Sequence, residues 1–302
     1  MKSAAKPKPS KRAVIDPEIG FALPATTAAQ RARAADLYAA LVAAYPDAHC
    51  ELDFGKPHEL LAATILSAQA TDVSVNRATP ALFARFKTPA DFAAASPAEI
   101  EPFIKTIGLY RTKAKALHGA MSALVNDFAG AVPRTMPELL TLRGVARKTA
   151  GVVLGNCFGV NVGVVVDTHV HRLSHRFALV PPATNVQNTE RTLMALFPRD
   201  KWNMLSHLLI FHGRRCCSAR LPARGPGQPA CPPRCDEGRG GICAQFGTRC
   251  ELRIIAKAAQ PTRERGSTKS TGRANTVRAK APKAKAAGAN VRAAAPERGR
   301  AQ

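Results

Sequence analysis

The feature of this sequence that most constrains its fold is a helical spacing of apolar residues. It continues, with short interruptions, from about residue 28 to residue 215. In 28–45, one face of the expected helix carries Leu37, Leu41, Val42 and Tyr45. No stretch of this region alternates apolar and polar residues in the manner of a β-hairpin. We therefore predict an all-α fold.

Further helices are expected wherever this spacing recurs between turn residues. In the short segment 135–142, Thr135 has the residue type of an N-cap and Pro137 lies near the first turn. The expected helical segments are 28–45, 57–72, 96–108, 111–128, 135–142, 147–159, 167–177, 188–197 and 201–215.

The chain is strongly basic, with 44 Lys and Arg residues against 21 Asp and Glu residues and a formal charge of +23 over 302 residues. More than half of this excess lies in 1–28 and 254–302, and the segment between them is basic as well. A basic surface of this size favours a polyanionic partner, and nucleic acid is the first candidate. The alternative is a soluble cationic protein without such a partner.

The two terminal segments, 1–28 and 254–302, are rich in Ala, Lys, Arg, Pro and Gly and contain few large apolar residues. Such segments bury too little surface to offset the entropy of ordering them, so we expect flexible basic tails. No apolar run approaches the ~20 residues that cross a bilayer, and the N-terminus lacks the apolar stretch of a secretory signal. We expect no membrane association.

A helix-hairpin-helix motif is expected around Gly144, where "LRGVARKTAGVVL" (142–154) joins two helical segments through a tight turn. The backbone amides at the start of the second helix suit a DNA phosphate. Lys148 falls in the first turn of that helix, where it is read either as a phosphate contact or as a catalytic nucleophile. Positive charge is disfavoured at a helix N-terminus, which favours the neutral amine that forms a Schiff base.

Asp167 lies nineteen residues after this lysine and occupies the N-cap position of the segment that follows. A carboxylate held there stays ionised and stabilises a cation that develops nearby. A lysine nucleophile and a fixed carboxylate together match the cleavage of an N-glycosidic bond. The carboxylate supports the oxocarbenium-like sugar, and the amine captures its C1′ atom.

Five motifs occur in the order and at the spacings of endonuclease III, a family of DNA glycosylases with an associated lyase activity on oxidised pyrimidines. The resemblance covers about residues 30–253. It implies that Lys148 is the Schiff-base nucleophile and Asp167 the electrostatic stabiliser. The motifs are "LSAQATDVSVN" (66–76), "IKTIGLY" (104–110), "LRGVARKTAGVVL", "VDTHVHR" (166–172) and "FHGRRCC" (211–217).

The resemblance also implies two helical domains with the active site in the cleft between them. The six-helix domain corresponds to 50–160, and the iron–sulfur cluster domain combines 29–49 with 161–253. The damaged nucleotide leaves the base stack to reach the cleft. Gln69 matches the residue that fills the hole left behind, and Leu109 matches the wedge inserted from the opposite side.

Other DNA contacts are expected in the hairpin and after the aspartate. The family hairpin reads Leu-Pro-Gly-Val-Gly, whereas this chain has Arg in place of Pro and Ala in place of the second Gly. The arginine adds a phosphate contact, and the alanine matters only if its position needs a positive φ. These expected contacts are Arg143, Gly144, Ala146, Arg147, His169 and Arg172.

Six of the eight cysteines fall between residues 216 and 250, in a loop rich in Pro, Gly and Arg. Without a secretory signal, such a density of thiols indicates an iron–sulfur or zinc site. The resemblance favours a [4Fe–4S] cluster, but the family spacing C-x6-C-x2-C-x5-C is shorter than the spacing here. The expected ligands are Cys217, Cys235, Cys243 and Cys250, with Cys231 as the alternative to Cys235. The expected role is structural, holding basic residues such as Arg214 and Arg215 against DNA phosphates.

The sequence therefore predicts a bifunctional DNA glycosylase and AP lyase of base excision repair, acting on duplex DNA with an oxidised pyrimidine or an abasic site. We expect a monomer of the bacterial cytoplasm, associated with the nucleoid. The first alternative is a monofunctional adenine-mismatch glycosylase, which lacks the Schiff-base lysine and carries a second recognition domain. The second is a non-catalytic DNA-binding iron–sulfur protein, in which the lysine–aspartate pair has no reason to be intact.

Overall fold

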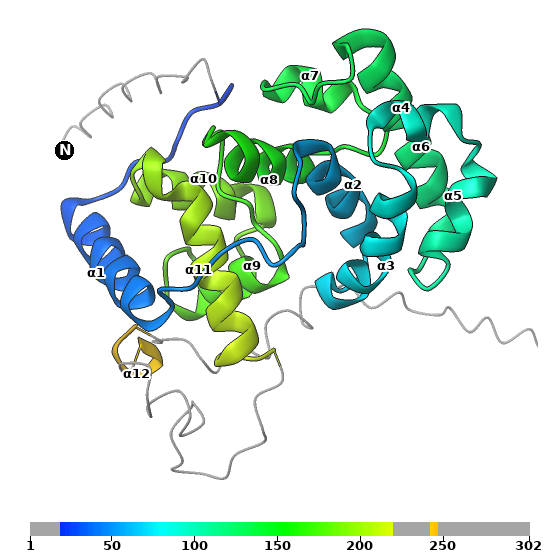
Figure 1. The fold of residues 1–302 in the computed structure, drawn as a ribbon. Helices are drawn as coiled ribbons and strands as arrows, with labels where there is room; N and C mark the ends of the chain where they lie inside the picture. Colours follow the sequence, from blue (N-terminus) through cyan, green and yellow to red (C-terminus); the bar gives the residue numbers. More distant parts are fainter. Residues whose placement is uncertain (1–18, 220–241, 247–302) are drawn as a thin grey trace, which may run out of the picture. The chain divides into compact units, whose positions relative to one another are not determined.

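The computed structural model describes residues 19–219 and 242–246, and within these ranges the prediction of an all-α fold is confirmed (Figure 1). The described residues form helices joined by turns and loops, with no β-strand among them. No described helix combines the length and the hydropathy that crossing a membrane requires. The helices are α1 Ala28–Ala44, α2 Pro57–Ser67, α3 Asp72–Arg85, α4 Pro89–Ala94, α5 Pro97–Ile104, α6 Tyr110–Phe128, α7 Met136–Thr141, α8 Arg147–Phe158, α9 Thr168–Arg176, α10 Val186–Leu196, the 3-10 turn η1 Arg199–Lys201, α11 Trp202–Arg215 and α12 Ile242–Phe246.

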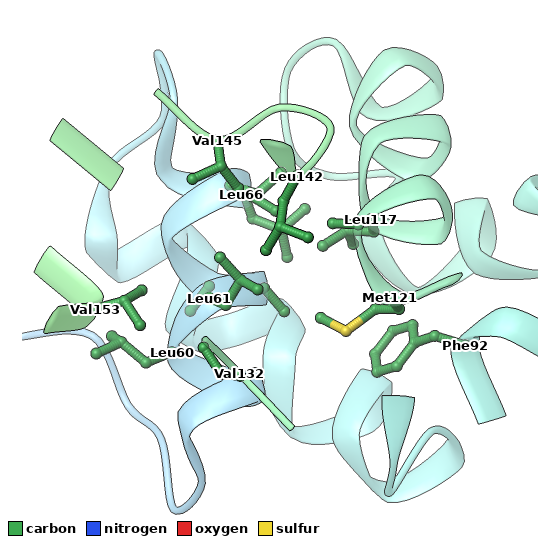
Figure 2. Close-up of a cluster of buried hydrophobic side chains, with 14 of the residues drawn as sticks. Leu60, Leu61, Leu66, Phe92, Leu117, Met121, Val132, Leu142, Val145 and Val153 are labelled. Carbon is green, nitrogen blue, oxygen red and sulfur yellow. The ribbon is translucent and has the colours of Figure 1, made fainter. Parts of the chain in front are cut away.

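Helices α2 to α8 enclose a first hydrophobic core, part of which is drawn in Figure 2. Helix α6 packs against α4 and α5, and α2 packs against α8. Within the core, Phe86 stacks on Phe92 with ring centroids 4.8 Å apart. Each fully buried leucine or phenylalanine contributes about 1.5–3 kcal/mol through removal of its apolar surface from water. This core fixes α8, the helix that carries Lys148.

A second hydrophobic core is formed by α1 together with α9 to α12. Helix α1 packs against α10, α11 and α12, although more than a hundred residues separate it from them in the sequence (Figure 1). Ile19 is buried in this core, so the expectation of a flexible tail over 1–28 is wrong from residue 19 onward. The chain thus starts in the second core, crosses to the first at residues 45–57 and returns after α8.

The apolar face of α1 is narrower than the sequence predicts. Leu37, Leu41 and Tyr45 are buried, but Val42 is 41% exposed, so its expected place on the buried face is wrong. At ~100° per residue, Val42 lies about 140° around the helix from Leu37 and outside the buried stripe.

The segment expected as one helix over 57–72 is divided by a turn. Helix α2 ends at Ser67, Gln69 adopts a left-handed φ of 55°, and Thr71 caps α3 by accepting a hydrogen bond from the Ser74 amide. Helices α3 and α4 were not predicted from the sequence. Their signals were the N-cap threonine of α3 and, for α4, a Thr-Pro start followed by an acidic residue that completes a capping box.

The segment expected as a helix over 96–108 also ends early. Helix α5 ends at Ile104, and a turn leads to Leu109, which has a left-handed φ of 61° and precedes α6. Non-glycine residues rarely adopt this backbone region, and when they do they are held there by their surroundings. Two of the expected DNA-inserting residues therefore stand on strained backbone.

The helix-hairpin-helix consists of α7, a turn at residues 142–146, and α8. As predicted, Thr135 caps α7 through a hydrogen bond from the Glu138 amide. Gly144 has a φ of +79°, and a Cβ atom at this position would lie 2.9 Å from the Cβ of Ala116. Ala146 has a φ of −102°, so its replacement of the family glycine requires no left-handed backbone.

We expect Gly144→Ala to lower the free energy of unfolding by about 2–4 kcal/mol, because it adds a steric contact to a left-handed backbone. Gly130→Ala is the matched control, since its φ is +77° but no atom lies within 4 Å of the added Cβ. It should cost only about 1–2 kcal/mol. Urea denaturation of both variants measures the difference, and equal losses would contradict the close packing of the hairpin against α6.

Candidate active site

A cavity of about 700 Å³ is lined by helices and loops of both hydrophobic cores. Gln69, Lys148 and Asn156 reach it from the first core and its loops, and Asp167, His207 and Arg214 reach it from the elements of the second. Lys148 and Asp167 therefore face the same space. Its remaining lining includes Thr64, Ser67, Asp72, Val152, Val165, His169, Asn203, Ser206 and Ile210.

Lys148 is the second residue of α8 and its side chain is exposed. The helix is oriented by Ala150, Val153 and Leu154, which are buried in the first core. Lys148 also lines a smaller cavity of about 210 Å³, and Glu190 is another of its lining residues. The amine thus stands at the helix N-terminus that the sequence predicts, on the wall of a space large enough for a base.

Asp167 is the N-cap of α9, and its Oδ1 atom accepts a hydrogen bond of 2.8 Å from the Val170 amide. Valines 164–166, which precede it, are buried and fix the approach of the chain. The carboxylate is therefore held at one edge of the cavity and bonded to the positive end of a helix.

Gln69 and Leu109 differ in their relation to the cavity. Gln69 is exposed and belongs to the lining, on the turn between α2 and α3. Leu109 is 62% exposed and is not among the described residues that line the cavity. An exposed leucine on a strained turn has no packing role of its own.

The two hairpin arginines are placed differently. Arg143 is exposed, and its methylene groups lie against Gly119 of α6, where a Cβ would come within 2.7 Å of the Arg143 Cδ. Arg147 is engaged inside the protein, donating from Nε to Glu190 (3.1 Å) and from Nη2 to the Val162 carbonyl (3.1 Å). The guanidinium of Arg147 thus links α8 to α10.

His169 and Arg172 lie on α9 close to the end of α11. The Nη2 atom of Arg172 donates to the carbonyls of Gly213 (3.1 Å) and Cys217 (2.9 Å) and lies 3.2 Å from the Nδ1 atom of His169. Burial lowers the pKa of His169. Only His169 of these two lines the cavity.

Two arginines that the sequence analysis expected to meet DNA phosphates are paired with carboxylates instead. Arg214 bonds to Glu51 and, at 2.6 Å, to Asp72, while Arg215 lies 2.9 Å from Asp47. Acidic side chains of the first half of the chain therefore engage both guanidinium groups in the described structure, and the phosphate contacts of Arg214 and Arg215 stay a prediction.

A polar wall that the sequence analysis did not identify faces the cavity between α8 and α11. His207 is buried, and its Nε2 atom lies 2.8 Å from Oδ1 of Asn156. The Nδ2 atom of Asn156 donates to the Val152 carbonyl at 2.7 Å, and Asn203 donates to Asn156 at 3.4 Å. Burial lowers the pKa of His207 to about 4, so its ring is neutral near pH 7.

The first expected cluster ligand, Cys217, is buried at the end of α11 beside Arg176. The Nη1 atom of Arg176 donates to the Cys217 Sγ at 2.9 Å. Hydrogen bonding with Cys243, together with His212 and Arg176, outweighs burial and lowers the pKa of the Cys217 thiol to about 4. The thiolate is the form that binds iron, so this environment fits a cluster ligand.

A second group of possible ligands gathers beside it. The ligand atoms of His212, Cys216 and Cys243 all lie within 4.8 Å of one another, and all three residues are buried. His212 was not singled out from the sequence, and Cys216 was noted only as a neighbour. The other expected ligands, Cys231, Cys235 and Cys250, lie outside the described residues. The described donor set is dominated by thiols, which suits an iron–sulfur cluster.

Comparisons with known proteins agree with this arrangement. Residues 62–199 match the family described as HhH-GPD superfamily base excision DNA repair protein. Endonuclease III of Synechocystis is 48% identical over 207 residues, which are 68% of this chain and 94% of that protein. Endonuclease III of Escherichia coli K12 is 42% identical over 60% of this chain and 84% of its own length.

Solved structures give the same result. A trapped covalent intermediate of endonuclease III with DNA is 40% identical, with a TM-score of 0.60 over 67% of this chain and 92% of that one. A non-covalent complex of endonuclease III with DNA is 37% identical, with a TM-score of 0.63 over 74% of this chain and 98% of that one. The chain therefore belongs to the endonuclease III family of helix-hairpin-helix base excision repair proteins.

Proposed function

We propose that the protein is a bifunctional DNA glycosylase and AP lyase that removes oxidised pyrimidines from duplex DNA. The observation that carries this proposal is the presence of Lys148 and Asp167 on one cavity between the two hydrophobic cores. The amine is a nucleophile, the carboxylate supports a sugar cation, and the cavity has room for an extruded base. This proposed reaction forms a covalent bond between enzyme and DNA, and one of the endonuclease III relatives was solved as such a covalent intermediate.

The reaction proceeds in two stages. The bond between C1′ and the base breaks, the base leaves with the electron pair and takes up a proton, and the amine of Lys148 bonds to C1′. Opening of the sugar ring gives an imine, which acidifies the C2′ protons. Loss of one of these protons expels the 3′ phosphate and nicks the strand. The carboxylate of Asp167 stabilises the positive charge on the sugar.

The duplex is distorted by two side chains in this proposal. Gln69 enters the hole left by the extruded nucleotide, and Leu109 is inserted as a wedge from the opposite side. Their exposure and their left-handed backbone support these roles, because each side chain projects from a turn that is strained without an evident packing reason.

The hairpin binds the DNA backbone without reading sequence. Gly144 and Ala146 present backbone amides to a phosphate, and Arg143 adds a charged contact. His169 approaches the DNA from the cavity edge. Arg147 and Arg172 contribute indirectly, by fixing α8 and α9, since their guanidinium groups bond within the protein.

A [4Fe–4S] cluster is proposed for the cysteine-rich segment, held by Cys217, Cys243, Cys250 and either Cys235 or Cys231. The cluster supplies cross-links that order the segment, and its role is structural. The buried thiols next to Arg176 support this proposal.

We further propose a division into a six-helix domain over about 50–160 and a cluster domain from 29–49 with 161–253, flanked by basic tails. The two separate hydrophobic cores support it. The protein works as a monomer on the DNA of the bacterial nucleoid.

The test is to incubate the purified protein with duplex DNA that carries thymine glycol, with and without borohydride. Borohydride reduces an imine to a stable amine, so a covalent adduct together with strand nicking is expected. Base release without an adduct would favour the water-using adenine-mismatch class. DNA binding with neither product, from protein whose cluster is intact, would favour the non-catalytic reading.

A further inference from the structure

The polar wall of the cavity contains a ring nitrogen of His207 that the described protein leaves open. The Nε2 atom of His207 is used by Asn156, but Nδ1 has no partner among the described residues, and it is not sealed from solvent. His207 itself is only 8% exposed and lines the cavity. The solvent that reaches Nδ1 therefore comes from the cavity side.

The protonation state of this ring follows from its partner. The amide of Asn156 is oriented by its Nδ2 bond to the Val152 carbonyl, so the atom that faces His207 is an oxygen. An oxygen accepts only, which places a proton on Nε2 of His207. The neutral imidazole carries one proton, so Nδ1 presents a lone pair and accepts a hydrogen bond.

The neighbouring hydroxyl groups are already engaged. The Ser206 hydroxyl donates to the Trp202 carbonyl and accepts from the Val165 amide, and the Thr64 hydroxyl donates to the Leu60 carbonyl. Nδ1 of His207 is thus an acceptor held in place on a cavity wall that also contains the apolar side chains of Val165 and Ile210. A buried acceptor in a base-sized cavity discriminates strongly, because it is left unpaired by a ligand without a matching donor.

We propose that His207 is a specificity-determining residue that accepts a hydrogen bond from the N3–H group of an extruded pyrimidine. Oxidised or saturated derivatives of thymine and uracil present this donor on their Watson–Crick edge. The inference rests on the proposed function, since it concerns the base that enters the cavity beside Lys148. Asn156 acts as a positioning residue that sets the tautomer of the histidine.

The experiment measures single-turnover rates on three duplexes, which carry 5,6-dihydrouracil, its N3-methyl derivative, or a preformed abasic site. The wild-type protein should excise dihydrouracil about 10- to 100-fold faster than the N3-methyl derivative, the range expected when a buried acceptor loses its donor. His207→Leu should slow excision of dihydrouracil by a similar factor. Its rate at the abasic site should stay within about twofold, because no base is present to be read.

His171→Leu is the matched control, since it removes an imidazole that bonds to Thr189 and does not line the cavity. It should leave all three rates and their ratios unchanged. If His207→Leu slows the three reactions equally, or leaves dihydrouracil excision unaffected, the assignment is overturned. If His207→Leu does not fold, the wild-type rates on dihydrouracil and on its N3-methyl derivative are the test. Equal excision rates on these two bases would overturn the assignment. Wild-type protein inactive on the abasic site as well would instead refute the proposed function, and this inference with it.

Discussion

Lys148→Ala is expected to abolish strand nicking and to reduce borohydride trapping by at least about 1,000-fold, the scale on which covalent catalysis fails without its nucleophile. The amine is the only atom of this side chain that bonds to the sugar in the proposed reaction, and alanine leaves α8 intact because Ala is the best helix former. Trapping on thymine glycol DNA and nicking at a preformed abasic site are the two measurements.

Lys115→Ala is the matched control for the loss of one positive charge, because Lys115 is an exposed residue of α6 outside the cavity. It should trap and nick at wild-type rates, with DNA affinity weakened only slightly. If Lys148→Ala is trapped by borohydride as efficiently as the wild-type protein, another amine is the nucleophile. The main support for the proposed mechanism is then lost.

Asp167→Asn is expected to lower the single-turnover rate of base excision by about 100- to 1,000-fold while leaving stability nearly unchanged. Asparagine is as good an N-cap as aspartate, so the hydrogen bond from the Val170 amide persists while the charge is lost. The sugar cation then develops without its counter-charge. The excision rate on thymine glycol DNA and a urea denaturation curve of the same preparation measure the two effects.

Asp167→Ala separates the two roles of this residue further. It should show the same loss of rate as Asp167→Asn, and its free energy of unfolding should fall by about 1 kcal/mol because the cap is lost. An asparagine variant with full activity would mean that Asp167 serves α9 only as a cap, and the electrostatic role would have to be withdrawn.

The helix-start positions of Lys148 and Asp167 could be predicted because both residues carry local signals, whereas their place on one cleft was implied only by the resemblance to endonuclease III. A glycine turn marks the start of α8 and a buried apolar run follows it, while a capping residue marks the start of α9 and three buried valines precede it. Most helices were predicted because each shows the helical spacing of apolar residues within its own segment. The turn at Gln69 was expected as continuous helix, and the helix before Leu109 was expected to end at 108 although it ends at Ile104, because strained backbone leaves no mark in a pattern of apolar residues.

Contacts between distant segments account for what the sequence does not reveal. His207 and Asn156 are 51 residues apart, and neither belongs to a motif, so only the packing of α11 on α8 brings them together. Charge counting also does not reveal the partners of Arg214. A guanidinium that binds phosphate and one that binds Glu51 and Asp72 look identical in composition.

The placement of α1 in the second core has a consequence for synthesis on the ribosome. Arg33 of α1 donates to the Phe246 carbonyl, and the two residues are 213 positions apart. At roughly 5–20 residues per second, α1 leaves the exit tunnel about 10 to 40 s before that partner is made. An isolated helix of this length is marginal in water, and its Leu37 and Leu41 lack their cover until α10 and α11 have been made. The nascent chain therefore exposes the apolar face of α1 while the first core is completed, and we expect this face to need protection from aggregation during synthesis.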